Sequence, residues 1–229
     1  MDKTKRLIEL GRELGVPIPL LYAGYKVTDK NGRILSDQYG PGHSWTRNYY
    51  NLLYGMAADT HGDNSGAFGA GYMSGKTTAG SIRSSLVYSP ARVSETLLGR
   101  GLNNNTTTNS FGIVCGTNDL AFDLNQYALQ TIIASGNAAG QLSHVAQAAP
   151  ALAYTAGTKT WKTTYTRLFN NNSGALITVK ESGLIWYAAM YIVGSESFLL
   201  ERNVPSPAVD VANGAQLTIT YSIEMVFPD

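Results

Sequence analysis

The glycine-rich run from Ala70 to Thr77 is the stretch whose spacing comes nearest to a ligand-binding motif. It satisfies the looser form of the phosphate-binding loop, in which backbone N–H groups and the N-terminus of a following helix hold phosphates. That motif needs a buried strand before the loop, but residues 63–69 contain no hydrophobic run, and Thr78 to Ser81 is a poor helix start. Nucleotide binding through this loop is therefore the least favoured of three functional hypotheses.

The other reactive side chains form no recognisable catalytic or metal-binding group. Residues 59–63 place two aspartates beside His61, where a cation could bind, but no second ligand group is apparent. His43 and His144 stand alone, outside any nucleophile pattern. A glycosidase-like carboxylate pair could be drawn from four glutamates, as in almost any β protein: Glu181, Glu196, Glu201 and Glu224. We predict no catalytic residue, no cofactor and no metal site, and we expect that the protein is not an enzyme.

The composition limits the partners that the protein can have. Charged residues make up 14% of the 229 residues and the net charge is +1, against about a quarter charged in typical soluble domains. Such a balance offers no field for sequence-specific nucleic-acid binding or for an anionic membrane. The single Cys115 excludes an internal disulfide and is expected to be a small buried hydrophobe. The N-terminus has neither a signal peptide nor a membrane-span pattern.

The last strand sets the predicted fold class. From Leu217 to Phe227 every odd position is large and apolar, and the even positions are polar except Val226. Because side chains on a strand point alternately to its two faces, this strand has one apolar face, which a second sheet must cover. Turn signals at regular spacing predict a mainly β chain, an antiparallel β-sandwich, jelly-roll-like, with short N-terminal helices.

Further elements follow from the same periodicities. Helices are predicted over Lys3–Leu14 and, after a Ser44 cap, over Trp45–Ala58. Charges at Lys180/Glu181 and Glu201/Arg202 are expected on exposed strand positions. Strands are predicted over 20–27, 33–35, 111–115, 142–154, 160–169, 176–187, 198–202 and 209–211, with 160–169 and 176–187 pairing as a hairpin around Asn170–Gly174.

The chain is divided at residue 40 in this prediction. Residues 1–40 are a helix and hairpin that form an N-terminal arm and an assembly contact, and residues 41–229 are one sandwich domain with an inserted helix and long Gly/Asn-rich loops. Candidate assembly contacts are the apolar side of the first helix and the small uncharged face of the last strand: Leu7, Leu10, Leu14, Thr218, Thr220 and Ser222. Low charge suits a subunit that is surrounded by neighbours.

Several C-terminal segments resemble virion-associated structural proteins of tailed bacteriophages. They are Gly112–Thr117, Thr166–Gly174, Val179–Leu184, Leu200–Pro207 and Val211–Tyr221, so the resemblance covers about residues 110–227 and, more weakly, Ser44–Tyr54. It implies a structural component of a virion, assembled in the host cytoplasm with copies of itself and other virion proteins. Capsid shell, capsid decoration, and tail or neck positions all stay open, and the resemblance carries no active site.

A lectin-like glycan-binding sandwich is the second hypothesis. Aromatic faces stack on sugars, and the candidate side chains are Trp45, Trp161, Trp186 and Tyr187. Because Trp161 and Trp186 fall within strand patterns, burial in a core or an interface is the favoured reading for both.

Overall fold

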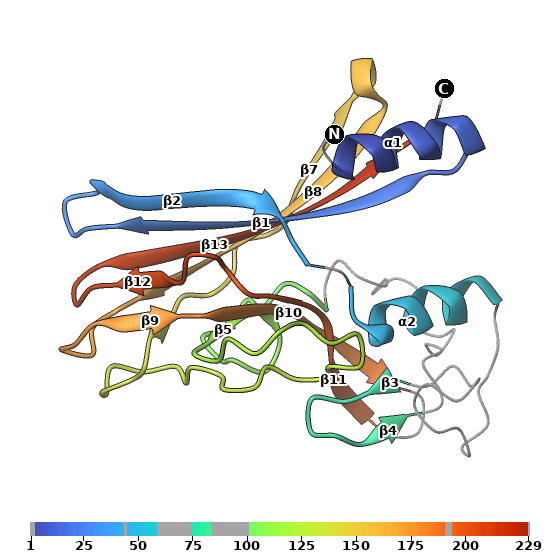
Figure 1. Cartoon of the computed structure of the whole chain (residues 1–229). Coiled ribbons are helices and arrows are strands. Elements are labelled where there is room, and N and C mark those ends of the chain that lie inside the picture. The colour runs from blue at the N-terminus through green and yellow to red at the C-terminus, as the bar shows by residue number, and fades with distance from the viewer. Residues whose placement is uncertain (1–2, 44, 59–74, 84–100, 191–193, 229) are drawn as a thin grey trace.

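The chain folds into two antiparallel sheets that pack face to face (Figure 1). A computed structural model describes residues 3–43, 45–58, 75–83, 101–190 and 194–228. The structure is 47% strand and 11% helix, which confirms the prediction of a mainly β, antiparallel fold with short helices. The finer jelly-roll assignment stays a prediction.

The first sheet contains six strands in the order β2-β1-β13-β8-β6, with β7 also paired to β8. Its strands are β1 (Ile18–Thr28), β2 (Ile34–Pro41), β6 (Ser143–His144), β7 (Ala151–Thr155), β8 (Thr160–Asn170) and β13 (Gln216–Val226). A 3-10 turn, η2 (Ala156–Thr158), joins β7 to β8. The strand β13 is central, and it pairs along its whole length with β1 on one side and β8 on the other.

The second sheet has the order β11-β10-β5 and is supplemented by two small strand pairs. The strands are β5 (Gly112–Gly116), β10 (Glu181–Met190) and β11 (Gly194–Asn203), with the pairs β9 (Ile177–Val179) and β12 (Val209–Val211), and β3 (Gly75–Lys76) and β4 (Ile82–Arg83). Helix α1 (Lys3–Leu14) precedes the first sheet. Helix α2 (Arg47–Ala58) packs on β11.

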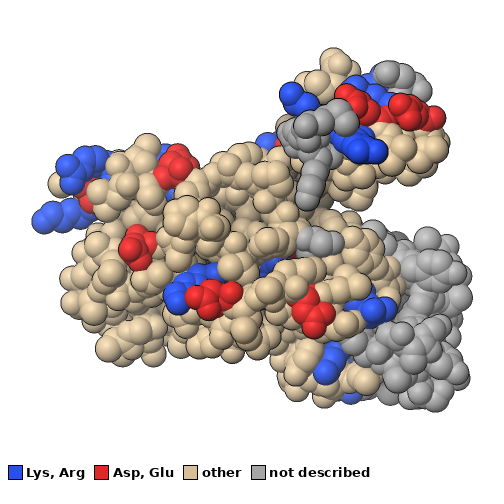
Figure 2. Space-filling model, viewed as in Figure 1, with Lys and Arg blue, Asp and Glu red and all other residues tan. Residues whose placement is uncertain are grey.

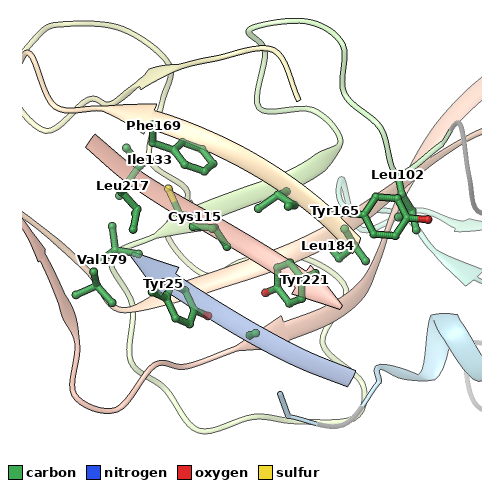
Figure 3. Close-up of a cluster of buried hydrophobic side chains, with 14 of the residues drawn as sticks. Tyr25, Leu102, Cys115, Ile133, Tyr165, Phe169, Val179, Leu184, Leu217 and Tyr221 are labelled. Atoms are coloured by element: carbon green, nitrogen blue, oxygen red, sulfur yellow. The ribbon is translucent and has the colours of Figure 1, made fainter. Parts of the chain in front are cut away.

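The main core lies between the two sheets (Figure 3). Tyr25, Leu217 and Tyr221 from the first sheet meet Cys115 and Leu184 from the second, and all five side chains are buried. The alternation predicted for the last strand is therefore confirmed for its first half. A smaller cluster of Val114, Ile185 and Leu199 lies on the other face of the second sheet.

The predicted hairpin between residues 160–169 and 176–187 is wrong. The strand β8 pairs with β13, whereas β10 pairs with β5 and β11. The chain crosses between sheets at Asn171, whose amide nitrogen donates to the carbonyls of Ala175 and Val211 at 2.8 and 2.6 Å. These bonds satisfy backbone carbonyls at the point where the chain passes from one sheet to the other. They do not close a tight hairpin turn.

The division at residue 40 is also incorrect, because the N-terminal hairpin is an integral part of the sandwich. The strand β1 lies between β2 and β13, and Tyr25 and Val27 belong to the core. The hairpin turn is held by Asp29, whose Oδ1 accepts hydrogen bonds from the backbone N–H groups of Asn31 and Arg33 at 2.9 Å. Of the described elements in residues 3–41, α1 and β2 contribute no side chain to the core.

The second helix begins at Arg47, two residues later than predicted, and Ser44 lies outside the described residues. Trp45 and Tyr49 stack with ring centroids 3.8 Å apart, and both are buried together with Leu52. The amide of Asn48 bonds the backbone N–H and carbonyl of Lys76 and the carbonyl of Leu199. The helix therefore joins β11 to the β3–β4 hairpin.

Both charge pairs predicted at the surface include buried members, so that expectation is wrong for Glu181, Glu201 and Arg202. Arg202 Nε donates to Glu181 Oε2 at 2.6 Å, and both side chains are fully buried. Glu181 also accepts the backbone N–H of Thr131 at 2.8 Å, while Arg202 donates to the carbonyl of Leu120 at 2.7 Å. A distant loop, residues 117–131, covers these strand positions.

Arg167 is the largest polar side chain of the sandwich interior, with 1% exposure. Its guanidinium donates to four main-chain carbonyls, at distances between 2.7 and 3.0 Å: those of Val145, Ile113, Thr106 and Thr108. Burial lowers the pKa of Arg167 to about 10, so the group remains charged at neutral pH. Arg167, on β8 of the first sheet, thus binds both β5 of the second sheet and the Asn/Thr-rich loop.

We predict that Arg167→Met destabilises the protein by about 3 kcal/mol, because four carbonyls, of which that of Ile113 is buried, lose a charged donor. The stability of Arg167→Lys should lie between those of Arg167→Met and the wild type, because an ammonium group keeps the charge but cannot reproduce the planar, forked set of donors of a guanidinium. Urea unfolding followed by circular dichroism measures both. Arg33→Met, at an exposed arginine, is the control and should leave the midpoint nearly unchanged. Equal midpoints for Arg167→Met and the wild type would contradict the role given to Arg167.

Candidate functional site

Cys115 and the two described histidines do not form a catalytic group. Cys115 is buried, as predicted, and burial raises the pKa of its thiol to about 12, so it is not a thiolate nucleophile at neutral pH. His144 is also buried, with its ring edge toward Phe169, and burial lowers the pKa of its imidazole to about 4. His43 is exposed and stacks with Phe122. The two imidazoles therefore belong to separate aromatic contacts, His144 with Phe169 and His43 with Phe122.

The four glutamates considered as a catalytic pair are separated by the fold. Glu181 faces the loop that covers the outer side of the second sheet, whereas Glu201 faces the space between the sheets, near Tyr221. Glu196 pairs with Arg83, and Glu224 pairs with Lys162 at 3.0 Å on the first sheet. A glycosidase arrangement needs two carboxyl groups facing one substrate, and this placement does not supply it.

The described part of the phosphate-loop candidate is a β-hairpin. Gly75 and Lys76 form β3, which pairs with β4, and the backbone N–H of Thr77 donates to the carbonyl of Ser81 at 2.8 Å. No helix begins in residues 75–83, and the Lys76 ammonium lies 3.8 Å from the centre of the Tyr127 ring. Residues 70–74 and the acidic cluster at 59–63 lie outside the described residues. In the described ranges, no group of three His, Cys, Asp or Glu side chains could hold a metal ion.

The first sheet continues beyond the second sheet and forms a projection, which we call the distal extension. It consists of β7 and the ends of three strands, residues 18–20, 160–162 and 224–226. On these strands the last residues of the main core are Leu21, Tyr165 and Tyr221. Figure 1 shows this end, with α1 and the C-terminus, standing away from the rest of the molecule.

One side of the distal extension is an uncovered apolar surface, which we call the distal face. The register aligns Pro19, Met225, Trp161 and Tyr154 in one row across four strands, with Leu152 in the next row. Trp161 and Tyr154 are 46% and 50% exposed, with ring centroids 5.0 Å apart, and Leu152 is 67% exposed. This row continues the core side of the first sheet, so these side chains would be buried if the second sheet reached further.

Helix α1 covers the opposite side of the distal extension. Its Gly11 is buried against Ile18, where a side chain would collide, so the helix axis approaches β1 closely. A groove of about 420 Å³ remains between helix and sheet, lined by Ile8, Arg12, Leu20 and Lys162 among others. Gly15, with φ of +66°, ends the helix as a C-cap glycine.

The three predicted contact leucines form an exposed line on α1, which we call the leucine stripe. Leu7, Leu10 and Leu14 are 43%, 47% and 67% exposed. The stripe lies about a quarter turn around the helix from Ile8 and Gly11, which face the sheet. The predicted helix is confirmed, and no described residue covers its leucines.

The predicted contacts on the last strand have a different outcome. Thr218 and Thr220 are partly exposed on the outer face of the first sheet, beside Lys26 and Gly24. Ser222 is 1% exposed, in register with Tyr22 of β1 and Thr164 of β8. Ser222 is therefore not available as a surface contact.

The aromatic residues considered for glycan binding do not form one site. Trp45 and Trp186 are buried, each 5% exposed, and Trp186 packs on Phe198. Tyr187 is exposed and stacks on Phe111 beside the second sheet. Trp161 is the exposed tryptophan, on the distal face.

A polar cluster crosses the core beside a surface hollow of about 290 Å³ that Tyr25 and Asn203 help to line. The hydroxyls of Tyr25 and Tyr221 each lie 2.6 Å from Ser182 Oγ, and the Asn203 amide donates to Tyr25 at 2.7 Å. The Glu201 carboxyl is fully buried near this cluster. Burial raises its pKa well above the ordinary value, and Tyr221 and Arg202 oppose this only in part.

Comparisons with protein-family models, curated proteins and solved structures gave no match. The resemblance to phage virion proteins therefore stays a prediction. Within the described ranges, no helix has the length and apolar character needed to cross a membrane.

We predict that Glu201→Gln stabilises the protein relative to the wild type as the pH rises above about 4.3, the pKa of an unperturbed glutamate. Above that pH the unfolded chain releases the proton and the folded state keeps it, so the free energy of unfolding of the wild type falls with pH. Urea midpoints at pH 4.5 and pH 8 measure the effect. Glu13→Gln, on the exposed side of α1, is the control. A Glu201→Gln advantage that is the same at both pH values would contradict the prediction.

Proposed function

We propose that this protein is a structural, non-enzymatic subunit of a tailed-phage virion, which assembles with copies of itself and with other virion proteins. The observation that carries the proposal is the distal face. A surface of Trp161, Tyr154 and Leu152 in water is costly for a monomer, because isolated domains seldom expose large contiguous apolar surfaces. Such surfaces mark sites of protein association.

The distribution of charge supports the same proposal. Figure 2 shows a largely uncharged face, with charged side chains on α1, at the turn between β1 and β2, and in a few small groups across the rest of the face. With a net charge of +1, little electrostatic repulsion opposes association. The reactive side chains that the structure describes are buried, paired or isolated, so an assembly role accounts for the molecule better than catalysis.

Glycan binding is the second candidate, and one observation favours it. The tilted pair of Trp161 and Tyr154 offers an exposed aromatic surface of the kind on which sugar rings stack. A glycan array separates the two proposals. Retention of a glycan that Trp161→Thr abolishes would favour a lectin role, whereas no retention by the wild type would remove it.

We predict that purified particles of the phage encoding this chain contain it in a fixed copy number, because a structural subunit occupies equivalent positions. Quantitative mass spectrometry of gradient-purified particles, with the major capsid protein as the internal standard, measures that number. Washing the particles with 1 M salt should not remove the chain, since contacts through the distal face are apolar. Absence from the particles would overturn the virion proposal.

A further inference from the structure

A polar pocket, which we call the loop pocket, lies between the turn of the β3–β4 hairpin, residues 77–81, and the loop of residues 117–131. Its volume is about 430 Å³, within the range of small-molecule sites. Most such sites are lined mainly by apolar side chains. Here six of the nine lining residues are polar: Thr78, Asp123, Asn125, Gln126, Tyr127 and Gln130.

The loop that forms one wall of the pocket is irregular, but it is fixed on both sides of the lining segment. The backbone N–H of Gln130 donates to the buried Glu181 carboxyl at 3.2 Å. Arg47 of α2 donates from its backbone N–H to the carbonyl of Leu124 and from Nε to Asn125 Oδ1, both at 2.7 Å. A wall held in this way needs little further ordering when a ligand binds, which favours affinity.

The hairpin that forms the other wall is fixed as well. The backbone N–H of Thr78 donates to the carbonyl of Ser197 on β11 at 2.8 Å. The side-chain amide of Asn48 bonds the backbone N–H and carbonyl of Lys76 at 2.8 and 2.9 Å. The Lys76 ammonium lies 3.8 Å from the centre of the Tyr127 ring, so this cation joins the two walls. The pocket is therefore preformed.

Several polar groups of the loop pocket have no hydrogen-bond partner in the described part of the chain. Gln126 is 9% exposed, and its Oε1 accepts the backbone N–H of Asp123 at 3.2 Å, but its Nε2 is unpaired. The Gln130 side-chain amide and the hydroxyls of Thr78 and Tyr127 are unpaired too. A nearly buried amide nitrogen without a partner requires an acceptor from water or from a ligand. The pocket thus offers donors and acceptors together.

The charges around the loop pocket disfavour an anion. Among the lining residues that the structure describes, Asp123 alone carries a formal charge. The neighbouring cations have other partners, since Lys76 contacts the Tyr127 ring and Arg47 bonds Asn125. A phosphate or carboxylate would meet a negative charge without a free counter-ion. An uncharged ring with several hydroxyls fits better, because each hydroxyl both donates and accepts.

We propose that the loop pocket binds one uncharged sugar residue of a glycan. The inference goes beyond the proposed structural role, because it requires neither the distal face nor an assembly. It also differs from glycan binding at Trp161, which lies on β8 of the first sheet, whereas the pocket is built by the β3–β4 hairpin and the loop that covers the second sheet.

Saturation-transfer NMR on the full chain tests the inference, because it detects weak binding in any state of assembly. The probes are glucose, galactose and mannose, each compared with its uronate. At least one neutral sugar should bind with a dissociation constant of about 1 mM, as expected for a single small ring. Its uronate should bind more weakly, because its carboxylate is repelled by Asp123.

Two pocket variants and a matched control locate the site. The first variant carries Thr78→Val and Tyr127→Phe, which remove two hydroxyls and keep the ring that Lys76 contacts. It should raise the dissociation constant at least about tenfold, because two hydrogen bonds to the sugar are lost. The second variant, Gln130→Ala, changes an exposed side chain and should weaken binding less. The control carries Thr107→Val and Tyr154→Phe, outside the pocket, and should bind like the wild type. Circular dichroism melting confirms that each variant folds.

Three results would overturn the inference. They are no saturation transfer to any neutral sugar, a uronate that binds at least as tightly as its neutral parent, and pocket variants that bind like the wild type. Loss of binding in the control alone would place the sugar on the distal face and would also overturn it. None of these results bears on the presence of the chain in virions, so failure here and failure of the proposed function are distinguishable.

Discussion

The buried guanidinium of Arg167 is the interaction on which the packing of the two sheets depends most. A charge placed in a sandwich core is tolerated only when every donor finds an acceptor. Here the acceptors are carbonyls from β5, from the Asn/Thr-rich loop and from the segment after β6. An irregular loop of polar residues is thereby fixed against the first sheet, and Arg202 does the same for the loop over the second sheet.

The sequence predicts those features that depend on local periodicity. The alternation from Leu217 to Tyr221 identifies a strand and its core side without any knowledge of its neighbours, and the leucine spacing in residues 3–14 does the same for α1. Partner choice is not local. Nothing around Asn170–Gly174 distinguishes a hairpin from a crossing, since Asn171 serves the crossing through a bond to the distant Val211.

The same distinction explains the surface predictions. Glu181 and Arg202 look like exposed strand charges because the loop that buries them lies 50 or more residues away in the chain. Trp161 looks like a core residue because it shares a strand face with Tyr165 and Phe169. Periodicity shows which side of a strand is apolar, but the point at which the opposing sheet ends depends on the whole fold. The sequence therefore predicts the strand that carries Trp161 correctly, but it does not show that this part of the strand is exposed.

The central position of β13 has a consequence for biosynthesis. Among the described strands β1 is synthesised first, yet one of its two neighbours, β13, is synthesised after all the others. Until residue 226 emerges, the apolar side of the N-terminal hairpin, with Tyr25 and Val27, has no complete sheet to join. The first sheet can therefore close only after β13 has been made, by a long-range pairing that is intrinsically slow. Until then the unpaired edge and the apolar side of β1 are exposed in the way that makes incompletely folded chains prone to aggregation.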